Sequence, residues 1–117
     1  MSTQLGHDNR RSGVRYPVSM AIRFSCLAQE RTGHLVNVSA KGCCVVSRNG
    51  TRGLTAGKSF VIVWMKLPGE STTIRVNPAR VRWIQDDRFG LEFIAAKSAD
   101  FVRIERFLNT LAEPESR

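Results

Sequence analysis

Two hydrophobic periods divide the chain into a long first part and a short second part. Up to residue 94, short segments alternate apolar and polar side chains, a pattern that predicts half-buried strands. The first segment shows this most clearly, with apolar side chains at Val18, Met20, Ile22, Phe24 and Cys26. Strands are predicted over residues 18–26, 30–38, 43–47, 58–67, 71–76, 79–84 and 89–94, with Asn77-Pro78 as a bend or bulge.

The period becomes helical after residue 94. Apolar side chains recur at the spacing of one helix face, at Phe101, Ile104, Phe107, Leu108 and Leu111. Ser98 can cap the start of this helix, Asp100 suits its first turn, and Glu113-Pro114 ends it. We therefore expect a helix over residues 98–112, packed on a small antiparallel barrel of six or seven strands. The fold class is mainly β.

A length of 117 residues corresponds to one domain with tails. The first nine residues, 1–9, are expected to form a flexible tail, and residues 113–117 a second tail. The longest apolar run has six residues, Phe60–Met65, whereas a membrane span needs roughly 20. No signal peptide is visible, and three cysteines, an odd number, argue against a disulfide scaffold. The chain is expected to be cytoplasmic.

Charge is the unusual feature of the composition. The net charge is +8, and fourteen of the eighteen basic residues are arginine. Residues 1–85 carry thirteen basic and three acidic groups (+10), whereas residues 86–117 carry five and seven (−2). Arginine suits phosphate groups and flat rings, so this balance favours an anionic partner. The alternative is a solvated basic surface without a ligand.

Candidate catalytic and metal-binding residues are few. The two histidines, His7 and His34, have no serine, cysteine or carboxylate at a telling spacing, so no nucleophile–base pair is evident. Cys43 and Cys44 are adjacent and should point to opposite faces of a strand, while Cys26 lies far away in sequence. Zinc sites show paired ligands at a different spacing. The sequence thus predicts neither an enzyme nor a metal site, and the cysteines read as small core residues.

Two short motifs flank the first strands. Arg11 and Arg15 form R-x-x-x-R directly before the first strand, and Asn37, Ser39 and Gly42 form N-x-S-x-x-G directly before the third. Each motif alone occurs often by chance, but their order and position together are much more specific. Two further segments complete the pattern, Arg82-Trp83 and Phe89-Gly90-Leu91-Glu92-Phe93.

This combination resembles the PilZ family of bacterial cyclic di-GMP receptors over residues 10–112. The resemblance implies a six-stranded antiparallel barrel at residues 18–95 and a helix at 98–112. It also implies a ligand-binding arm at 10–17 that wraps over the mouth of the barrel. The implied function is non-catalytic, without a cofactor: binding of cyclic di-GMP changes the arm and signals to a protein effector that the sequence does not identify. Asparagine at 37 is an accepted variant of the family's aspartate.

The residue chemistry suits such a ligand. The implied site consists of Arg10, Arg11, Arg15, Asn37, Ser39, Gly42 and Trp83. Arginine forks bind phosphate or the O6 and N7 atoms of guanine, and their planes stack on bases. An amide oxygen accepts from guanine nitrogens, a serine hydroxyl donates, and a glycine lets the backbone approach. The extra arginine, Arg10, would favour an intercalated ligand dimer.

Simpler interpretations remain open for each part of this site. The arginines could form a solvated tail, with Arg10 pointing into water, and residues 37–42 could be a purely structural turn. Trp83 could pack in the core, where Trp64 and Phe93 are also expected.

Two alternative functions also stand beside the receptor. One is a single-stranded nucleic-acid-binding barrel of OB or cold-shock type. The aromatic residues needed for base stacking are few, however, and no RNA-binding signature appears, so neither DNA nor RNA is the expected partner. The other is a PilZ-type adaptor that no longer binds nucleotide.

Overall fold

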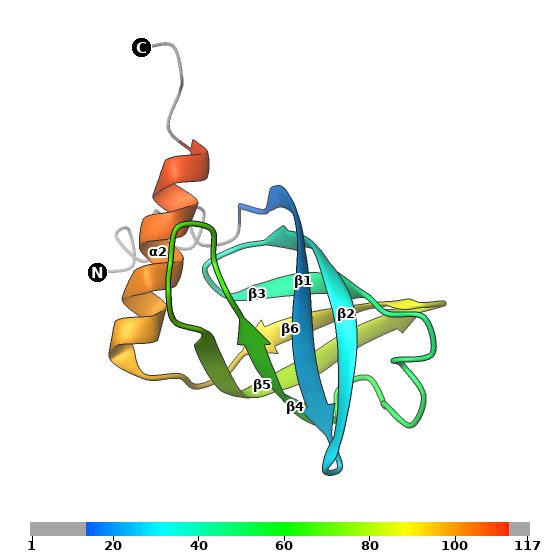
Figure 1. Cartoon of the computed structure of the whole chain (residues 1–117). Coiled ribbons are helices and arrows are strands. Elements are labelled where there is room, and N and C mark those ends of the chain that lie inside the picture. Colours follow the sequence, from blue (N-terminus) through cyan, green and yellow to red (C-terminus); the bar gives the residue numbers. More distant parts are fainter. Residues whose placement is uncertain (1–13, 113–117) are drawn as a thin grey trace, which may run out of the picture.

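The computed structural model describes residues 14–112. Within these residues, six strands precede one helix (Figure 1). The strands are β1 (Tyr16–Cys26), β2 (Gln29–Val38), β3 (Gly42–Val46), β4 (Phe60–Met65), β5 (Ile74–Gln85) and β6 (Arg88–Phe93). The helix, α2, spans Ser98–Ala112, as its apolar period predicts. The expected tails at 1–9 and 113–117, and residues 10–13 of the expected arm, lie outside the described residues.

The strands close into a barrel in the order β1-β2-β3-β6-β5-β4. All six neighbouring pairs are antiparallel. The predicted mainly β fold, a six-stranded antiparallel barrel with a C-terminal helix, is therefore confirmed. Closure leaves no strand edge unpaired, which removes the main route to edge-to-edge association.

The segments 71–76 and 79–84 are parts of one strand, β5, so the barrel has six strands rather than seven. Val61 of β4 pairs with Ala79 and Val63 pairs with Val76, which leaves Asn77 and Pro78 opposite a single β4 residue. This is the bulge that the sequence allowed for at Asn77-Pro78. A bulge suits proline because the extra residue needs no N–H for the ladder.

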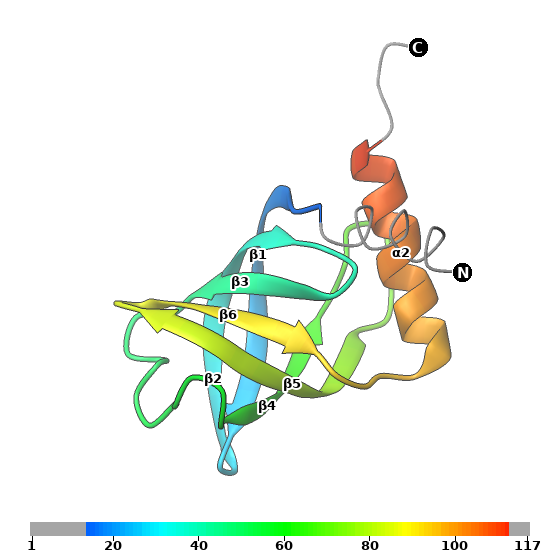
Figure 2. The ribbon, with the colours of Figure 1, turned by 180° about the vertical axis from the view of Figure 1, so that it is seen from behind.

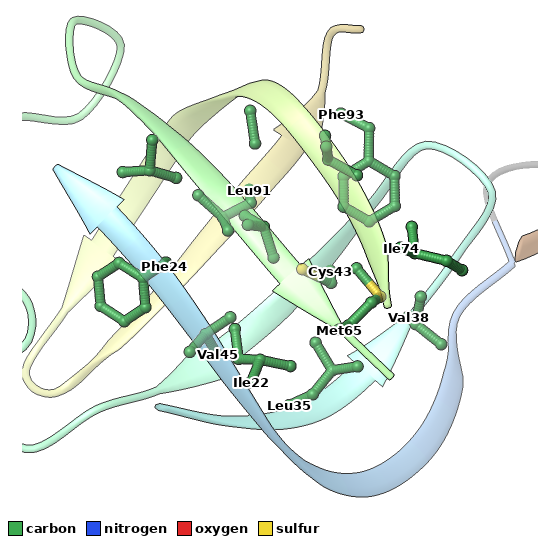
Figure 3. Close-up of a cluster of buried hydrophobic side chains, with 14 of the residues drawn as sticks. Ile22, Phe24, Leu35, Val38, Cys43, Val45, Met65, Ile74, Leu91 and Phe93 are labelled. Carbon is green, nitrogen blue, oxygen red and sulfur yellow. The ribbon is translucent and has the colours of Figure 1, made fainter. Parts of the chain in front are cut away.

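Alternate side chains of every strand fill the barrel interior (Figure 3). Phe24 and Phe89 meet edge to face there, with ring centroids 5.2 Å apart. Phe93 belongs to this core, as expected, but the expectation for Trp64 is wrong. Its neighbours Val63 and Met65 face the interior, and strand alternation therefore places Trp64, half-buried, on the outer face.

The helix α2 packs beside the barrel against β5 and β1 (Figure 2). Ile104 and Leu108 supply its buried apolar contacts. Its first turn is anchored by Asp100, whose Oδ2 accepts a hydrogen bond of 3.2 Å from the Arg75 backbone N–H. The helix thus has a fixed position relative to the outer face of β5.

Candidate functional site

The turn between β2 and β3 is built around one buried serine. The Ser39 hydroxyl oxygen accepts hydrogen bonds from the backbone N–H groups of Lys41 and Gly42, both at 3.2 Å. The Ser39 N–H donates to the Gly42 carbonyl at 2.8 Å. Ser39 is only 3% exposed, so its hydroxyl serves the turn in this structure. The N-x-S-x-x-G motif therefore has a structural role, which is compatible with a binding role.

Gly42 is required by the packing of strands. It pairs with Glu92 of β6, and a Cβ built on it would lie 2.1 Å from the Leu91 carbonyl oxygen. No real Cβ approaches an oxygen so closely, and the neighbour is backbone that cannot rotate away. The glycine of the motif thus permits β3 and β6 to meet. That Gly42 also lets the backbone approach a ligand stays a prediction.

A bulge in β2 directs Asn37 to the outer face. Leu35 pairs with Val45 and Asn37 pairs with Cys44, so Val36 is an extra residue in β2. Leu35 and Val38 both face the interior, and the side chain of Asn37 is left on the outside. There its Oδ1 accepts a hydrogen bond of 3.0 Å from Arg15 Nη1. One member of each predicted motif is therefore in direct contact.

A second bulge, in β5, brings Trp83 to the same face. Val81 pairs with Leu91 and Trp83 pairs with Gly90, so Arg82 is the extra residue. Trp83 is 37% exposed, which excludes the core-packing alternative. Its indole lies on Gly90, where a Cβ would be 2.2 Å from Nε1.

Cross-strand pairing joins these residues into one row over four strands. The row runs from β2 through β3 and β6 to β5, as Asn37, Cys44, Gly90 and Trp83. The floor between the amide and the indole consists of a cysteine and a glycine. The absence of a side chain at position 90 leaves room for the Trp83 indole, which lies on Gly90.

A hollow of about 330 Å³ lies over this part of the barrel. Its lining includes Arg15, Ser39, Lys41, Gly42, Arg82, Trp83, Gly90, Leu91 and Glu92. Three cations and one carboxylate give the lining a net charge of +2. We call it the motif hollow. Four of the predicted site residues line it, a fifth contacts it through Arg15, and Arg10 and Arg11 lie outside the described residues.

Three charged residues of the motif hollow were not assigned to the site by motif reasoning: Lys41, Arg82 and Glu92. Glu92 Oε1 accepts a hydrogen bond of 2.9 Å from Arg82 Nη1 and lies 3.6 Å from Arg80 Nε. This carboxylate positions the Arg82 guanidinium at the rim. The alternation of β6 could have placed Glu92 on the same face as Gly90. Its neighbours on β3 and β5 could be known only from the strand pairing.

The buried thiol of Cys43, in the barrel interior, is unsuited to nucleophilic chemistry. Burial raises the pKa of the Cys43 thiol well above its usual range, and neighbouring Cys44 raises it further, although the positive charge of Arg15 opposes both. The thiol therefore stays neutral, and a neutral thiol is a poor nucleophile. Among residues 14–112, no three histidine, cysteine or acidic side chains gather as metal ligands. Nor does any helix in that range have the length and apolar character needed to cross a membrane.

Comparisons with known proteins agree with this geometry. The profile of the PilZ domain matches residues 9–110. Among solved structures, the PilZ domain of CeSA from a cellulose-synthesizing bacterium is 17% identical, with a TM-score of 0.67 over 86% of this chain and 100% of that one. The Bacillus subtilis inhibitor of motility, MotI/DgrA, is 23% identical, with a TM-score of 0.64 over 86% of this chain and 52% of that one. A search of curated protein sequences finds no match. The profile covers most of the chain, and the chain belongs to the PilZ domain family.

Proposed function

We propose that the protein is a receptor for cyclic di-GMP that acts by binding, without catalysis, and signals to a protein partner in the bacterial cytoplasm. The observation that carries this proposal is that Arg15 of the first motif meets the second motif at one hollow. Arg15 donates a hydrogen bond to Asn37, and Ser39, Gly42 and Trp83 line the same hollow as Arg15. Membership of the PilZ domain family supports the same conclusion.

The charges of the motif hollow suit this ligand, which carries two phosphates and two guanines. The guanidiniums of Arg15 and Arg82 are separate forks that can bind phosphate or the O6 and N7 edge of guanine. The exposed part of the Trp83 indole offers a flat surface for a base, a contact worth about 1–3 kcal/mol in single-stranded nucleic-acid complexes. Asn37 both accepts from Arg15 and faces the ligand side, so it can orient the guanidinium before binding.

Arg10 and Arg11 complete the proposed site from the segment before β1. We propose that binding fixes the conformation of this arm over the motif hollow, and that the change in the arm is what a partner recognises. A third arginine next to the R-x-x-x-R motif adds a fork that suits an intercalated dimer of the ligand. Two ligands per chain are therefore expected, falling towards one in Arg10→Leu.

Isothermal titration calorimetry with cyclic di-GMP tests the proposal. We expect saturable binding in the micromolar range or tighter, about −8 kcal/mol. Oligothymidylate and oligouridylate serve as controls, and their binding should be weak and lost as salt is raised. Absence of heat with cyclic di-GMP at large excess, or tighter binding of the oligonucleotides, would refute the receptor function. The same ratio of ligand to protein for the wild type and Arg10→Leu would refute only the role of Arg10.

A further inference from the structure

A second groove lies away from the motif hollow, between α2 and the outer face of β4 and β5. Its volume is about 690 Å³, within the range of roughly 300–1,000 Å³ of ligand sites. In Figures 1 and 2, the chain passes from β6 into the start of α2 at this edge of the barrel. None of the residues that line the groove lines the motif hollow. We call it the helix groove.

Trp64 gives this groove an aromatic side. Arg23 of β1, Trp64 of β4 and Arg75 of β5 are direct cross-strand neighbours, so they form a row on the outer face. The Arg23 guanidinium carbon lies 5.0 Å from the centroid of the Trp64 ring, a cation–π contact that holds the indole in place. Half-buried tryptophans flanked by arginines have the composition of interface hot spots.

Part of the charge in the helix groove is already neutralised. Arg103, with a side chain only 15% exposed, donates to Glu70 Oε1 at 2.9 Å and to Asp100 Oδ1 at 3.1 Å. It also donates to the Thr72 carbonyl at 2.6 Å. These contacts tie the helix to the β4–β5 connection, so Arg103 is a structural clamp and its charge is not available to a partner.

Arg75 and Lys97 carry the charge that remains. Both are exposed, and within the described part of the chain neither side chain has a hydrogen-bond or ion-pair partner. The lining as a whole has three cations and one carboxylate, a net charge of +2. An exposed pair of cations beside a positioned indole is complementary to carboxylates next to an apolar side chain.

The groove is held open by backbone hydrogen bonds. The Asn77 N–H donates to the Ala95 carbonyl at 2.8 Å, and the Ala95 N–H donates to the Pro78 carbonyl at 3.2 Å. Val76 and Ala96 form a further bridge. Lys97 follows directly on this bonded segment, so its backbone is fixed relative to Arg75. The charged groups therefore need little rearrangement before a partner binds.

We propose that the helix groove is the docking site for an acidic segment of the protein partner. Carboxylates of the segment bind Arg75 and Lys97, and an apolar side chain packs on Trp64. A protein partner is part of the proposed function, on which this assignment rests. A nucleic-acid strand suits the groove less well, because single strands bind by stacking successive bases on several aromatic side chains and Trp64 is the one aromatic residue among the described residues that lines this groove.

Nuclear magnetic resonance titration of the full chain tests this assignment. The probe is the synthetic peptide acetyl-Glu-Leu-Glu-Glu-Leu-Glu-amide, compared with its lysine counterpart. The glutamate peptide should shift the Trp64 indole N–H and the backbone amides of Arg75 and Lys97, and the lysine peptide should not. Shifts spread evenly over all basic surfaces, or no shift at the helix groove, would overturn the proposal. So would a stronger shift there with hexathymidylate.

Charge reversal separates the helix groove from a general basic surface. The double variant Arg75→Glu, Lys97→Glu should weaken peptide binding roughly tenfold or more, since both complementary charges become repulsive. The matched control is Lys58→Glu, Arg88→Glu, which reverses two exposed cations elsewhere and should leave peptide binding nearly unchanged. Equal losses in both double variants would overturn the proposal.

Binding of cyclic di-GMP is measured on these three samples, the wild type and both double variants, and also on Arg15→Ala. It should be unchanged in both charge-reversal variants, because the helix groove and the motif hollow share no lining residue. A wild type that binds the peptide but not cyclic di-GMP would refute the receptor function, and a wild type that binds cyclic di-GMP but not the peptide would refute the docking site.

Discussion

A methyl group at position 42 should weaken the barrel before it affects any ligand. The Cβ of alanine would lie 2.1 Å from the Leu91 carbonyl oxygen and 3.3 Å from the Glu92 Cα, both backbone atoms of β6. Gly42 does not have a positive φ, so the alanine itself is not strained and the cost is steric alone. Relief requires β3 to move away from β6 by roughly an ångström, beyond what side-chain rotation can supply.

The size of the effect follows from what that movement breaks. Overpacking of a close contact costs about 1–3 kcal/mol. The Gly42 carbonyl also accepts from the Ser39 N–H at 2.8 Å, and its N–H donates to the Ser39 hydroxyl at 3.2 Å. Weakening these two bonds adds about 1 kcal/mol. We expect a total loss of about 3 kcal/mol, which corresponds to a melting temperature about 12 °C lower for a domain of this size.

Urea and thermal unfolding followed by circular dichroism measure this loss, and Gly90→Ala is the matched variant. There the added Cβ would meet the Trp83 indole, a side chain that can turn outward. Gly90→Ala should therefore lower the free energy of unfolding by about 1 kcal/mol or less. It should also change tryptophan fluorescence and weaken the binding of cyclic di-GMP. If Gly42→Ala melts within about 2 °C of the wild type but no longer binds cyclic di-GMP, the steric reasoning is refuted and Gly42 faces the ligand.

Three further substitutions or treatments have distinct expected outcomes. Arg15→Ala removes the donor to Asn37 and should weaken the binding of cyclic di-GMP by about 1.5–3 kcal/mol in calorimetry. The melting temperature should be nearly unchanged because Arg15 is exposed, and a large melting shift with unchanged affinity would contradict this. Arg103→Met leaves buried Asp100 without its cation and should destabilise the fold by about 3 kcal/mol in urea, whereas equal stability would mean that the clamp contributes nothing. Burial raises the pKa of the Cys43 thiol far above its ordinary value of 9.0. This thiol should therefore react with a thiol reagent only after unfolding. Because the thiol of the unfolded chain ionises above pH 9.0 while the native thiol stays neutral, the free energy of unfolding should be unaffected by Cys43 below pH 9.0 and fall as the pH rises further. Rapid labelling of the native protein would refute the burial of Cys43.

The elements of this fold follow largely from local pattern, but the faces of individual residues do not. The helix at 98–112 and the turn at 37–42 depend on residues close in sequence, so period and turn chemistry predict them. Strict alternation from Val81 would direct Trp83 into the core. The bulge at Arg82 reverses this, and a bulge is set by pairing with β6, which no local pattern contains.

The candidate site was predicted to the extent that its residues belong to contiguous motifs. The motifs name Arg15 and Asn37, and the structure adds the bulge at Val36 that puts them in contact. Glu92 was missed because its importance comes from cross-strand partners, Arg80 and Arg82, rather than from its own neighbours in sequence. The helix groove was missed for the same reason, since it brings together residues of β4, β5, the segment 95–97 and α2.

Separating the motif hollow from the helix groove has a thermodynamic consequence for signalling. A ligand alters the affinity of a partner only if the partner distinguishes the bound from the free receptor. The helix groove is fixed by backbone bonds that involve no residue of the motif hollow, so it contributes the same free energy in both states. Under the proposed function, the arm before β1 supplies the difference, and a regulated partner has to contact both the arm and the helix groove. Because α2 packs against β5 and β1, a partner lying along the helix can do so. Charge reversal at Arg75 and Lys97 should then lower the partner's affinity by the same factor with and without cyclic di-GMP, leaving the ratio of the two affinities unchanged.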